Sequence, residues 1–215
     1  MSIAFKLPRF YPILDTALLA ECQIPALGAA EILAKAGVRI MQYRHKEAWT
    51  QAHLNEAKQV AALCRDAGIL FVINDRADFA HLLGAALHLG QDDLPPLAAR
   101  RVIGDEVIGF STHNHDQLTL GQEEAVEYLS LGPIFNTKSK LKPDPVVGLD
   151  RLQALRPLTN KPLCAIGGIT LENARQTLAA GADSVAVISG WLPKSANSDN
   201  WIKRYAQEWV HLTSE

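Results

Sequence analysis

The sequence predicts an α/β protein, a (β/α)8 barrel of the TIM type, and three patterns support this fold class. Eight short apolar runs recur along the chain, and each is nearly continuous rather than alternating, as in strands covered on both faces. Segments with apolar residues at three- and four-residue spacing lie between them and indicate amphipathic helices. Several of these segments end in glycine just before the next run, as at Gly37, Gly68 and Gly181.

Each predicted element follows from these patterns in chain order. We expect strands at residues 11–14, 39–42, 70–73, 86–89, 107–110, 128–131, 163–166 and 184–187. The helices between them are expected at residues 26–36, 51–67, 77–83, 95–103, 116–124 and 171–180. A doubly wound open sheet is the alternative with the same element order.

The chain length fits one such barrel. A chain of 215 residues that is 48% hydrophobic can bury a large core, although two small domains would also fit this length. We expect a single domain over residues 1–215, with residues 1–9 as an N-terminal extension and residues 195–215 carrying a terminal helix. Trp201, Tyr205 and Trp209 fall four apart on that helix and would pack it onto the barrel.

Composition excludes several classes of function. The formal net charge of -2 gives no broad basic field, so we expect no nucleic-acid partner. No apolar stretch is long enough for a membrane span or a signal peptide. The cysteines at positions 22, 64 and 164 are far apart and form no CxxC, which favours a reducing compartment. We therefore predict a cytoplasmic protein that acts on small molecules.

Ligands of parallel α/β folds bind at the carboxyl ends of the strands, and polar residues follow every predicted strand. Gln42, Arg44 and Lys46 alternate after the second strand and would point the same way, with both cations facing an anion. Asp75 and Asp93 follow neighbouring strands, and two carboxylates with substrate phosphates are a usual way to hold Mg²⁺. Asp93 could instead cap the next helix, unless Asp92 does so.

A hydroxyl- and lysine-rich loop follows the sixth strand. It holds Thr137, Ser139 and Lys140, which supply donors and positive charge suited to phosphate, although a solvated surface loop is the plainer interpretation. Gly168 after the seventh strand, and Ile188 and Ser189 after the eighth, lie where barrels commonly bind phosphate through backbone amides. His113 and His115 lack a nearby third ligand, so we expect no metal site there.

These motifs, in this order, resemble the thiamine phosphate synthase family over nearly the whole chain from Tyr11 to Gly190. The resemblance is carried by Gln42-x-Arg44-x-Lys46, Ile73-Asn74-Asp75-Arg76, His88-Leu89-Gly90-Gln91-Asp92-Asp93, Ser111-Thr112-His113, Gly132-Pro133-Ile134-Phe135-x-Thr137-x-Ser139-Lys140, Ala165-Ile166-Gly167-Gly168-Ile169 and Val187-Ile188-Ser189. It implies a barrel transferase that joins a hydroxymethylpyrimidine diphosphate to a thiazole phosphate. The products would be thiamine phosphate and pyrophosphate, and Mg²⁺ would assist.

The resemblance also implies a role for each matched residue. Asp75 and Asp93 would bind the metal, and the diphosphate would contact Arg44, Lys46, Asn74 and Lys140. The pyrimidine would lie near Gln42, His88 and Gln91, the reacting centre near Ser111, Thr137 and Ser139, and the thiazole phosphate near Gly168, Ile188 and Ser189. Arg44, Lys46, Ser111 and Lys140 would be the catalytic groups.

The sequence departs from the family pattern at a few positions and leaves alternatives open. The family's Ala-Asp-Gly-x-His is replaced by Gly84-Ala85-Ala86-Leu87-His88, which makes the register of the fourth strand an open point. Asn136 replaces a usual proline, and Ser139 stands where threonine is common. A thiazole tautomerase on the same barrel and a non-catalytic thiamine-phosphate binding protein remain as alternatives. A monomer and a homodimer are both compatible with the sequence.

Overall fold

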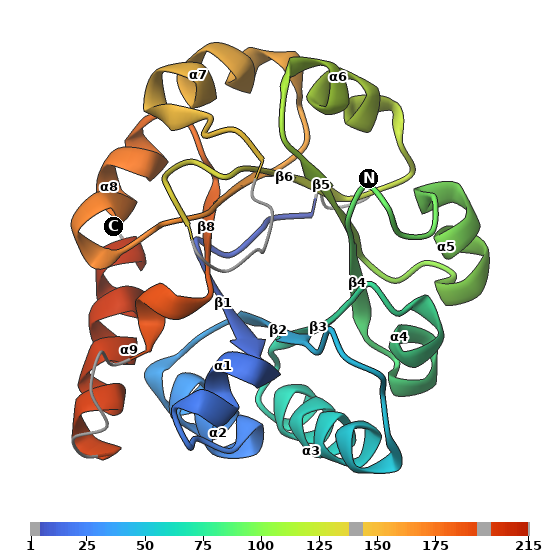
Figure 1. Cartoon of the computed structure of the whole chain (residues 1–215), viewed down its shortest axis with the longest axis vertical. Coiled ribbons are helices and arrows are strands. Elements are labelled where there is room, and N and C mark those ends of the chain that lie inside the picture. Colours follow the sequence, from blue (N-terminus) through green and yellow to red (C-terminus); the bar gives the residue numbers. More distant parts are fainter. Residues whose placement is uncertain (1–4, 138–143, 193–198, 215) are drawn as a thin grey trace.

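The parallel strands close into a barrel in chain order, as the sequence predicted. The computed structural model describes residues 5–137, 144–192 and 199–214, and within these ranges eight strands pair in parallel, β1 with both β2 and β8 (Figure 1). Closure excludes the open doubly wound sheet. The strands are β1 Phe10–Asp15, β2 Ile40–Arg44, β3 Leu70–Asn74, β4 Ala86–Leu89, β5 Ile108–Thr112, β6 Tyr128–Leu131, β7 Leu163–Ile166 and β8 Ser184–Val187.

Several strands run further than their apolar runs predicted. β1 ends at Asp15, β2 at Arg44 and β3 at Asn74, one or two residues beyond the expected bounds. The barrel ladder needs only backbone groups, so polar residues continue a strand when their side chains face a cavity. The open question about the fourth strand is resolved, because β4 pairs with β3 so that His88 lies beside Asn74.

Helices cover the outside of the barrel (Figure 1). They are α1 Thr16–Glu21, α2 Ala26–Ala36, α3 Gln51–Asp66, α4 Ala77–Leu83, α5 Pro96–Ile103, α6 His115–Glu123, α7 Gly148–Leu155, α8 Leu171–Ala179 and α9 Asp199–Ser214. The sequence analysis did not predict α1 and α7, which are short. Gly37 and Gly84 end α2 and α4 in the left-handed conformation. In the described part of the chain, no helix has the length and apolar character needed to cross a membrane.

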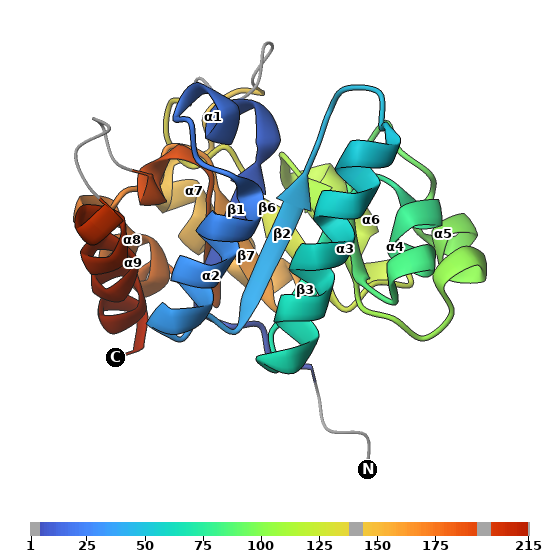
Figure 2. The same ribbon diagram turned by 90° about the horizontal axis from the view of Figure 1, so that it is seen from below.

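Two apolar clusters make up the core: a larger one that includes side chains of the covering helices, and a smaller one inside the barrel. Tyr11, Tyr128 and Cys164 belong to it, together with Leu7 from the segment before β1. Phe5 stacks against the Tyr128 ring with 6.1 Å between ring centroids. The N-terminal segment lies at the end of the barrel opposite α1, which follows the carboxyl end of β1 (Figure 2). Within the predicted N-terminal extension, Phe5 and Leu7 therefore pack at the amino-terminal end of the barrel.

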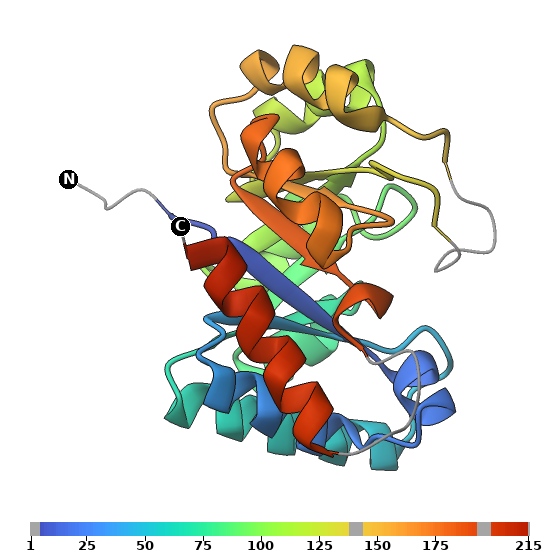
Figure 3. The same ribbon diagram turned by 90° about the vertical axis from the view of Figure 1, so that its left-hand side faces the viewer.

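The last helix packs onto the barrel wall, as predicted from its aromatic spacing. α9 lies alongside α2 and α8 and crosses β1 (Figures 1 and 3). Trp209 is fully buried, stacks on Phe10 with 5.0 Å between ring centroids, and donates a hydrogen bond from Nε1 to the carbonyl oxygen of Gly190. The side chain of Trp201 lies outside the described residues. Trp209 thus links the terminal helix to the loop after β8.

Candidate active site

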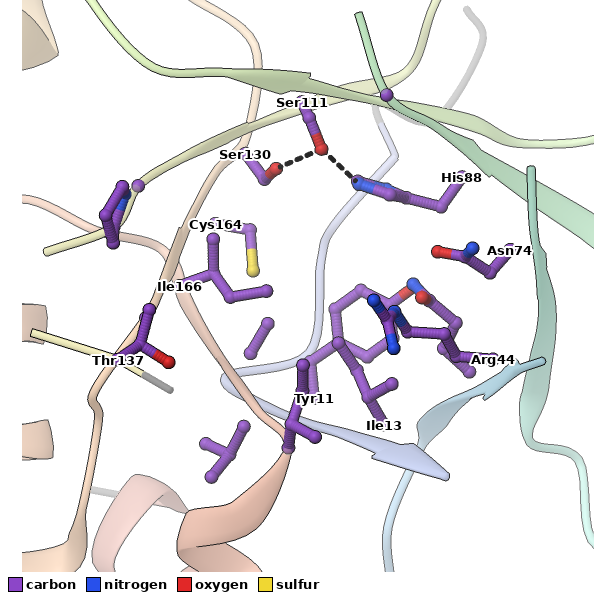
Figure 4. Close-up of a pocket in the computed structure, with 18 of the residues that line it drawn as sticks. Tyr11, Ile13, Arg44, Asn74, His88, Ser111, Ser130, Thr137, Cys164 and Ile166 are labelled. Atoms are coloured by element: carbon purple, nitrogen blue, oxygen red, sulfur yellow. Dashed lines mark hydrogen bonds between the residues drawn. The ribbon is translucent and has the colours of Figure 1, made fainter. Parts of the chain in front are cut away.

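One cavity of about 470 Å³ opens at the carboxyl ends of the strands. Most of the predicted site residues line it, and they come from seven strands, β2 to β8, and the loops that follow them. Those residues are Gln42, Arg44, Lys46, Asn74, Asp75, His88, Gln91, Asp93, Ser111, Thr137, Gly168, Ile188 and Ser189. Ser139 and Lys140 lie outside the described residues. In Figure 4, Thr137 lies across the cavity from Asn74 and Arg44.

Both described cations of the site are paired with carboxylates. Asp15 and Arg44 are opposite one another in the β1–β2 ladder, and the Arg44 guanidinium donates a hydrogen bond to the Asp15 carboxylate. The Lys46 ammonium lies 2.5 Å from Oδ2 of Asp75. Asp15 was expected among the polar residues at the strand ends but was assigned no role in the site. Its position directly after the first apolar run was the available signal.

Asp75 and Asp93 form the acidic part of the cavity. The backbone of Asp75 takes a left-handed φ of 64°, and its N–H donates to the carbonyl oxygen of His88 over 2.8 Å. Asp93 accepts a hydrogen bond from the Gly90 N–H over 2.6 Å. Burial, followed by the hydrogen bond with the Asp75 carboxyl group, raises the pKa of Asp93. The two carboxyl groups are therefore close neighbours.

The helix after these acids begins later than expected. The N-cap of α5 is Pro95, which has no side-chain hydrogen bond to the helix. The proposal that Asp92 caps this helix is therefore wrong. Proline's fixed φ and missing N–H already suit the first turn, so the helix does not need a carboxylate cap. Asp93 holds the turn at Gly90 instead.

Asn74 lines the cavity and carries a buried donor without a partner among the described residues. Its side chain is buried, and among the described residues its Nδ2 has no hydrogen-bond partner. A buried amide without a partner is costly, so a ligand in the cavity would gain from accepting this hydrogen bond. Asn74 is therefore placed to bind an anion or another acceptor.

His88 is buried and is also part of the cavity wall. Its Nδ1 lies 3.0 Å from the hydroxyl of Tyr128, and its Nε2 lies 2.9 Å from Oγ of Ser111. Burial lowers the pKa of His88 to about 4; the nearby Asp93 opposes that shift and Lys46 adds to it. The imidazole is therefore neutral at physiological pH. Figure 4 shows its bond to Ser111, which continues to Ser130.

Two tyrosines extend this hydrogen-bonded wall below the cavity. The hydroxyls of Tyr11 and Tyr128 lie 3.0 Å apart, and the Gln42 amide donates to the Tyr11 hydroxyl over 2.9 Å. Sequence reasoning assigned no role to either tyrosine, because each is part of an apolar run. Their hydroxyls, which need a partner when buried, were the signal that could have marked them.

The glycines after β7 pack against the loop after β6. Gly168 has a φ of +64°, and a Cβ atom there would lie 2.5 Å from the carbonyl oxygen of Asn136. The same loop holds Thr137, and Ser189 lines the cavity nearby from the turn after β8. A side chain at position 168 would push these segments apart.

His113 also lines the cavity, although the sequence analysis gave it no role. Its Nδ1–H donates to the carbonyl oxygen of Gly132 over 2.6 Å, and its Nε2 lies 3.6 Å from a carboxylate oxygen of Asp144. Its backbone N–H donates to Oε1 of Gln117 over 2.8 Å. His113 thus connects the end of β5 to both ends of the loop that follows β6.

Comparisons with known proteins agree with the family that the motifs resemble. A family model described as thiamine monophosphate synthase matches residues 10–191. A thiamine-phosphate synthase of Koribacter versatilis is 48% identical over 201 residues, which cover 89% of this chain and 92% of the relative. A thiamine-phosphate synthase of Chloroflexus aurantiacus is 39% identical over 191 residues and 88% of each chain.

A solved structure supports the same conclusion. Thiamine phosphate pyrophosphorylase from Pyrococcus furiosus superposes with a TM-score of 0.82 at 26% identity, covering 96% of this chain and 95% of that chain. A structure titled native KDPGal has a TM-score of 0.71 at 16% identity and shows the fold alone.

Proposed function

The chain belongs to the thiamine monophosphate synthase family and makes thiamine phosphate, and we propose how its cavity performs this synthesis. In the proposed reaction, a hydroxymethylpyrimidine diphosphate and a thiazole phosphate, or its carboxylate, give thiamine phosphate and pyrophosphate. The proposal is carried by one observation: cations, a pair of carboxyl groups and neutral donors line a single cavity. Because the reaction transfers an alkyl group, we class the enzyme as a transferase.

We propose Asp75 and Asp93 as the ligands of Mg²⁺. The residues fit the ion, because the two carboxyl groups share a hydrogen bond beside Lys46. A divalent cation would reduce the repulsion between these carboxyl groups. Mg²⁺ commonly uses one or two carboxylates together with substrate phosphates. When bound, the ion would neutralise charge on the departing diphosphate.

The diphosphate is proposed to lie among Arg44, Lys46 and Asn74, with Lys140 joining from the loop after β6. Arg44 and Lys46 supply positive charge, and the unpartnered Nδ2 of Asn74 supplies a donor. These groups would interact more strongly as negative charge grows on the leaving group than with the resting substrate. Their contribution would therefore stabilise the transition state.

The aminopyrimidine is proposed to lie against Gln42, His88 and Gln91. The Gln42 amide nitrogen is held by Tyr11, so its oxygen can accept a hydrogen bond from the exocyclic amino group. Gln91 donates from Nε2 to the carbonyl oxygen of Ser111 over 2.5 Å, which brings its side chain beside the reacting centre. A neutral His88 suits this position, because it adds no charge that would oppose a developing pyrimidine cation.

The thiazole phosphate is proposed to lie at the opposite end, at Gly168, Ile188 and Ser189. Ser111, Thr137 and Ser139 would surround the reacting carbon between the two substrates. The pyrimidine can delocalise the positive charge that forms when pyrophosphate departs, and the thiazole nitrogen attacks with its own lone pair. No general base is needed in this step. A site rich in cations and hydroxyls agrees with such a dissociative substitution.

A coupling assay tests this proposal. The purified chain is mixed with both substrates and Mg²⁺, and thiamine phosphate and pyrophosphate are measured together. We expect equal amounts of the two products, and we expect Asp93→Ala to abolish Mg²⁺-dependent turnover more than it harms folding. Asp116→Ala is the matched control, because that carboxylate is exposed on α6 outside the cavity.

The same assay separates the alternatives. Isomerisation of the thiazole carboxylate without coupling would identify a tautomerase. Binding of thiamine phosphate without either reaction would identify a non-catalytic binding protein. Full turnover by Asp93→Ala would remove Asp93 from the site while leaving the synthase activity in place.

A further inference from the structure

A continuous chain of hydrogen bonds runs through the wall of the cavity. It passes from Gln42 to Tyr11, Tyr128, His88 and Ser111, with links of 2.9, 3.0, 3.0 and 2.9 Å. The links join β2, β1, β6, β4 and β5, so residues far apart in the sequence form one connected network. Tyr128 does not line the cavity and can affect a bound substrate only through its neighbours.

The direction of this chain follows from its first member. Gln42 donates its amide N–H to the Tyr11 hydroxyl, so the hydrogen of Tyr11 is left to donate to Tyr128. Tyr128 in turn has its hydrogen free for Nδ1 of His88. The opposite direction would leave the buried Tyr11 hydroxyl hydrogen without an acceptor among the described residues, which folded proteins avoid. Burial raises the pKa of both phenols, so each keeps its hydrogen.

The tautomer of His88 then follows. A neutral imidazole has one donor and one acceptor, and Nδ1 accepts from Tyr128, so the proton is on Nε2 and is donated to Ser111. Ser130 also donates to Oγ of Ser111, over 3.3 Å. Because the Ser111 oxygen accepts two hydrogen bonds from the wall, its own hydrogen remains available to a ligand in the cavity.

The backbone beside Tyr128 is shaped to hold its phenol in this chain. Gly109 of β5 lies against the ring, and a Cβ atom at that position would be 2.0 Å from Cζ of Tyr128 and 2.4 Å from its hydroxyl oxygen. Any other residue at position 109 would displace the phenol from its hydrogen bonds. The hydroxyl is therefore fixed by the strand as well as by its partners.

We propose that Tyr128 is a positioning residue, which fixes His88 as the Nε2–H tautomer and thereby makes Ser111 a hydrogen-bond donor to the departing diphosphate. This inference rests on the proposed function, because it specifies how one wall of the same site is prepared for the anion. A serine locked as a donor favours an anionic acceptor and needs no reorientation as negative charge develops. The residue acts through His88 and Ser111 and does not touch the substrate itself.

The tautomer can be measured without any substrate. In protein labelled with ¹⁵N-histidine, two-bond ¹H–¹⁵N correlation spectra distinguish protonated from unprotonated ring nitrogens, and His88→Gln assigns the signals of His88. We expect a protonated Nε2 and an unprotonated Nδ1 in the wild-type protein. In Tyr128→Phe we expect both tautomers to be populated, because Nδ1 then has no polar partner. Tyr43→Phe is the matched control, since this buried phenol donates only to Glu56, outside the chain of bonds.

Kinetics provide the second readout. We expect Tyr128→Phe to lower kcat about tenfold, the rate equivalent of one hydrogen bond, with KM for the diphosphate changed less than about twofold. Tyr43→Phe should leave both constants unchanged. A protonated Nδ1 in the wild-type protein, or a single Nε2–H tautomer retained in Tyr128→Phe, would overturn the proposal. The wild-type spectrum decides the direction of the chain even if the variant does not fold, and it is readable whether or not coupling activity is found.

Discussion

The ammonium group of Lys46 lies 2.5 Å from Oδ2 of Asp75, across the carboxyl ends of β2 and β3. The sequence assigned these two residues to different ligands, the lysine to a diphosphate and the aspartate to a metal ion. Their contact shows that, without ligands, each can neutralise the other. A metal ion arriving at Asp75 would release Lys46 toward the phosphates, so binding of the two ligands should be coupled.

Lys46→Met should therefore change how the protein responds to Mg²⁺. Without the lysine, the carboxylates of Asp75 and Asp93 repel one another with less compensation, so we expect a lower Tm in EDTA than for the wild type. Mg²⁺ should then raise Tm by more in the variant than in the wild type, while turnover falls. Thermal unfolding with and without Mg²⁺ measures this, and an equal Mg²⁺ shift in both proteins would contradict it.

Asp15→Asn should impair catalysis through Arg44. The amide can still accept the hydrogen bond from the Leu18 N–H that caps α1, but it loses the charge that holds the guanidinium. We expect kcat to fall about tenfold, the loss of one oriented charged hydrogen bond in the transition state, with little change in thermal stability. Steady-state kinetics test this. Asp66→Asn, an exposed change in α3, is the control and should have no effect.

Gly168→Ala should weaken binding at the thiazole-phosphate end. The new methyl group would meet the carbonyl oxygen of Asn136, and alanine is strained at a φ of +64°. We expect KM for the thiazole phosphate to rise at least about tenfold, with KM for the diphosphate nearly unchanged. Gly28→Ala is the control, because a Cβ there meets nothing within 4 Å. This change should stabilise α2 by about 0.5–1 kcal/mol, since alanine has a higher helix propensity than glycine. Equal effects on both substrates would argue against separate ends of the cavity.

His88 should make the metal-free protein less stable in mild acid. Its pKa is lowered to about 4, so the unfolded chain takes up the proton first as pH falls. The free energy of unfolding should therefore decrease as the pH falls from about 6.5, the ordinary histidine pKa, to about 4. The decrease should reach about 3 kcal/mol, and below pH 4 His88 should contribute no further change. Urea titrations at several pH values measure the slope. His88→Gln should remove this part of the slope, and an unchanged profile would contradict it.

The sequence predicted those site residues that lie at or just after the carboxyl end of a strand. Gln42 and Arg44 alternate on β2, Lys46 follows two residues after its end, and all three line the cavity, as their spacing indicated. Asp75 and Asp93 were expected on neighbouring strands and lie close together. Tyr11 and Tyr128 were missed, because both lie within apolar runs, and the sequence does not show which partners their hydroxyls meet across the barrel.

By itself, the sequence predicted eight strands with helices between them, a barrel as the favoured fold, and the family of the chain. Apolar periodicity and terminal glycines are local properties, and the motifs lie within a few residues of each strand end. Only the tertiary structure decided which side chains meet: Asp15 with Arg44, Lys46 with Asp75, and Tyr128 with His88. These contacts depend on the register between strands and on closure of the barrel, which set distances of a few ångströms between residues remote in sequence.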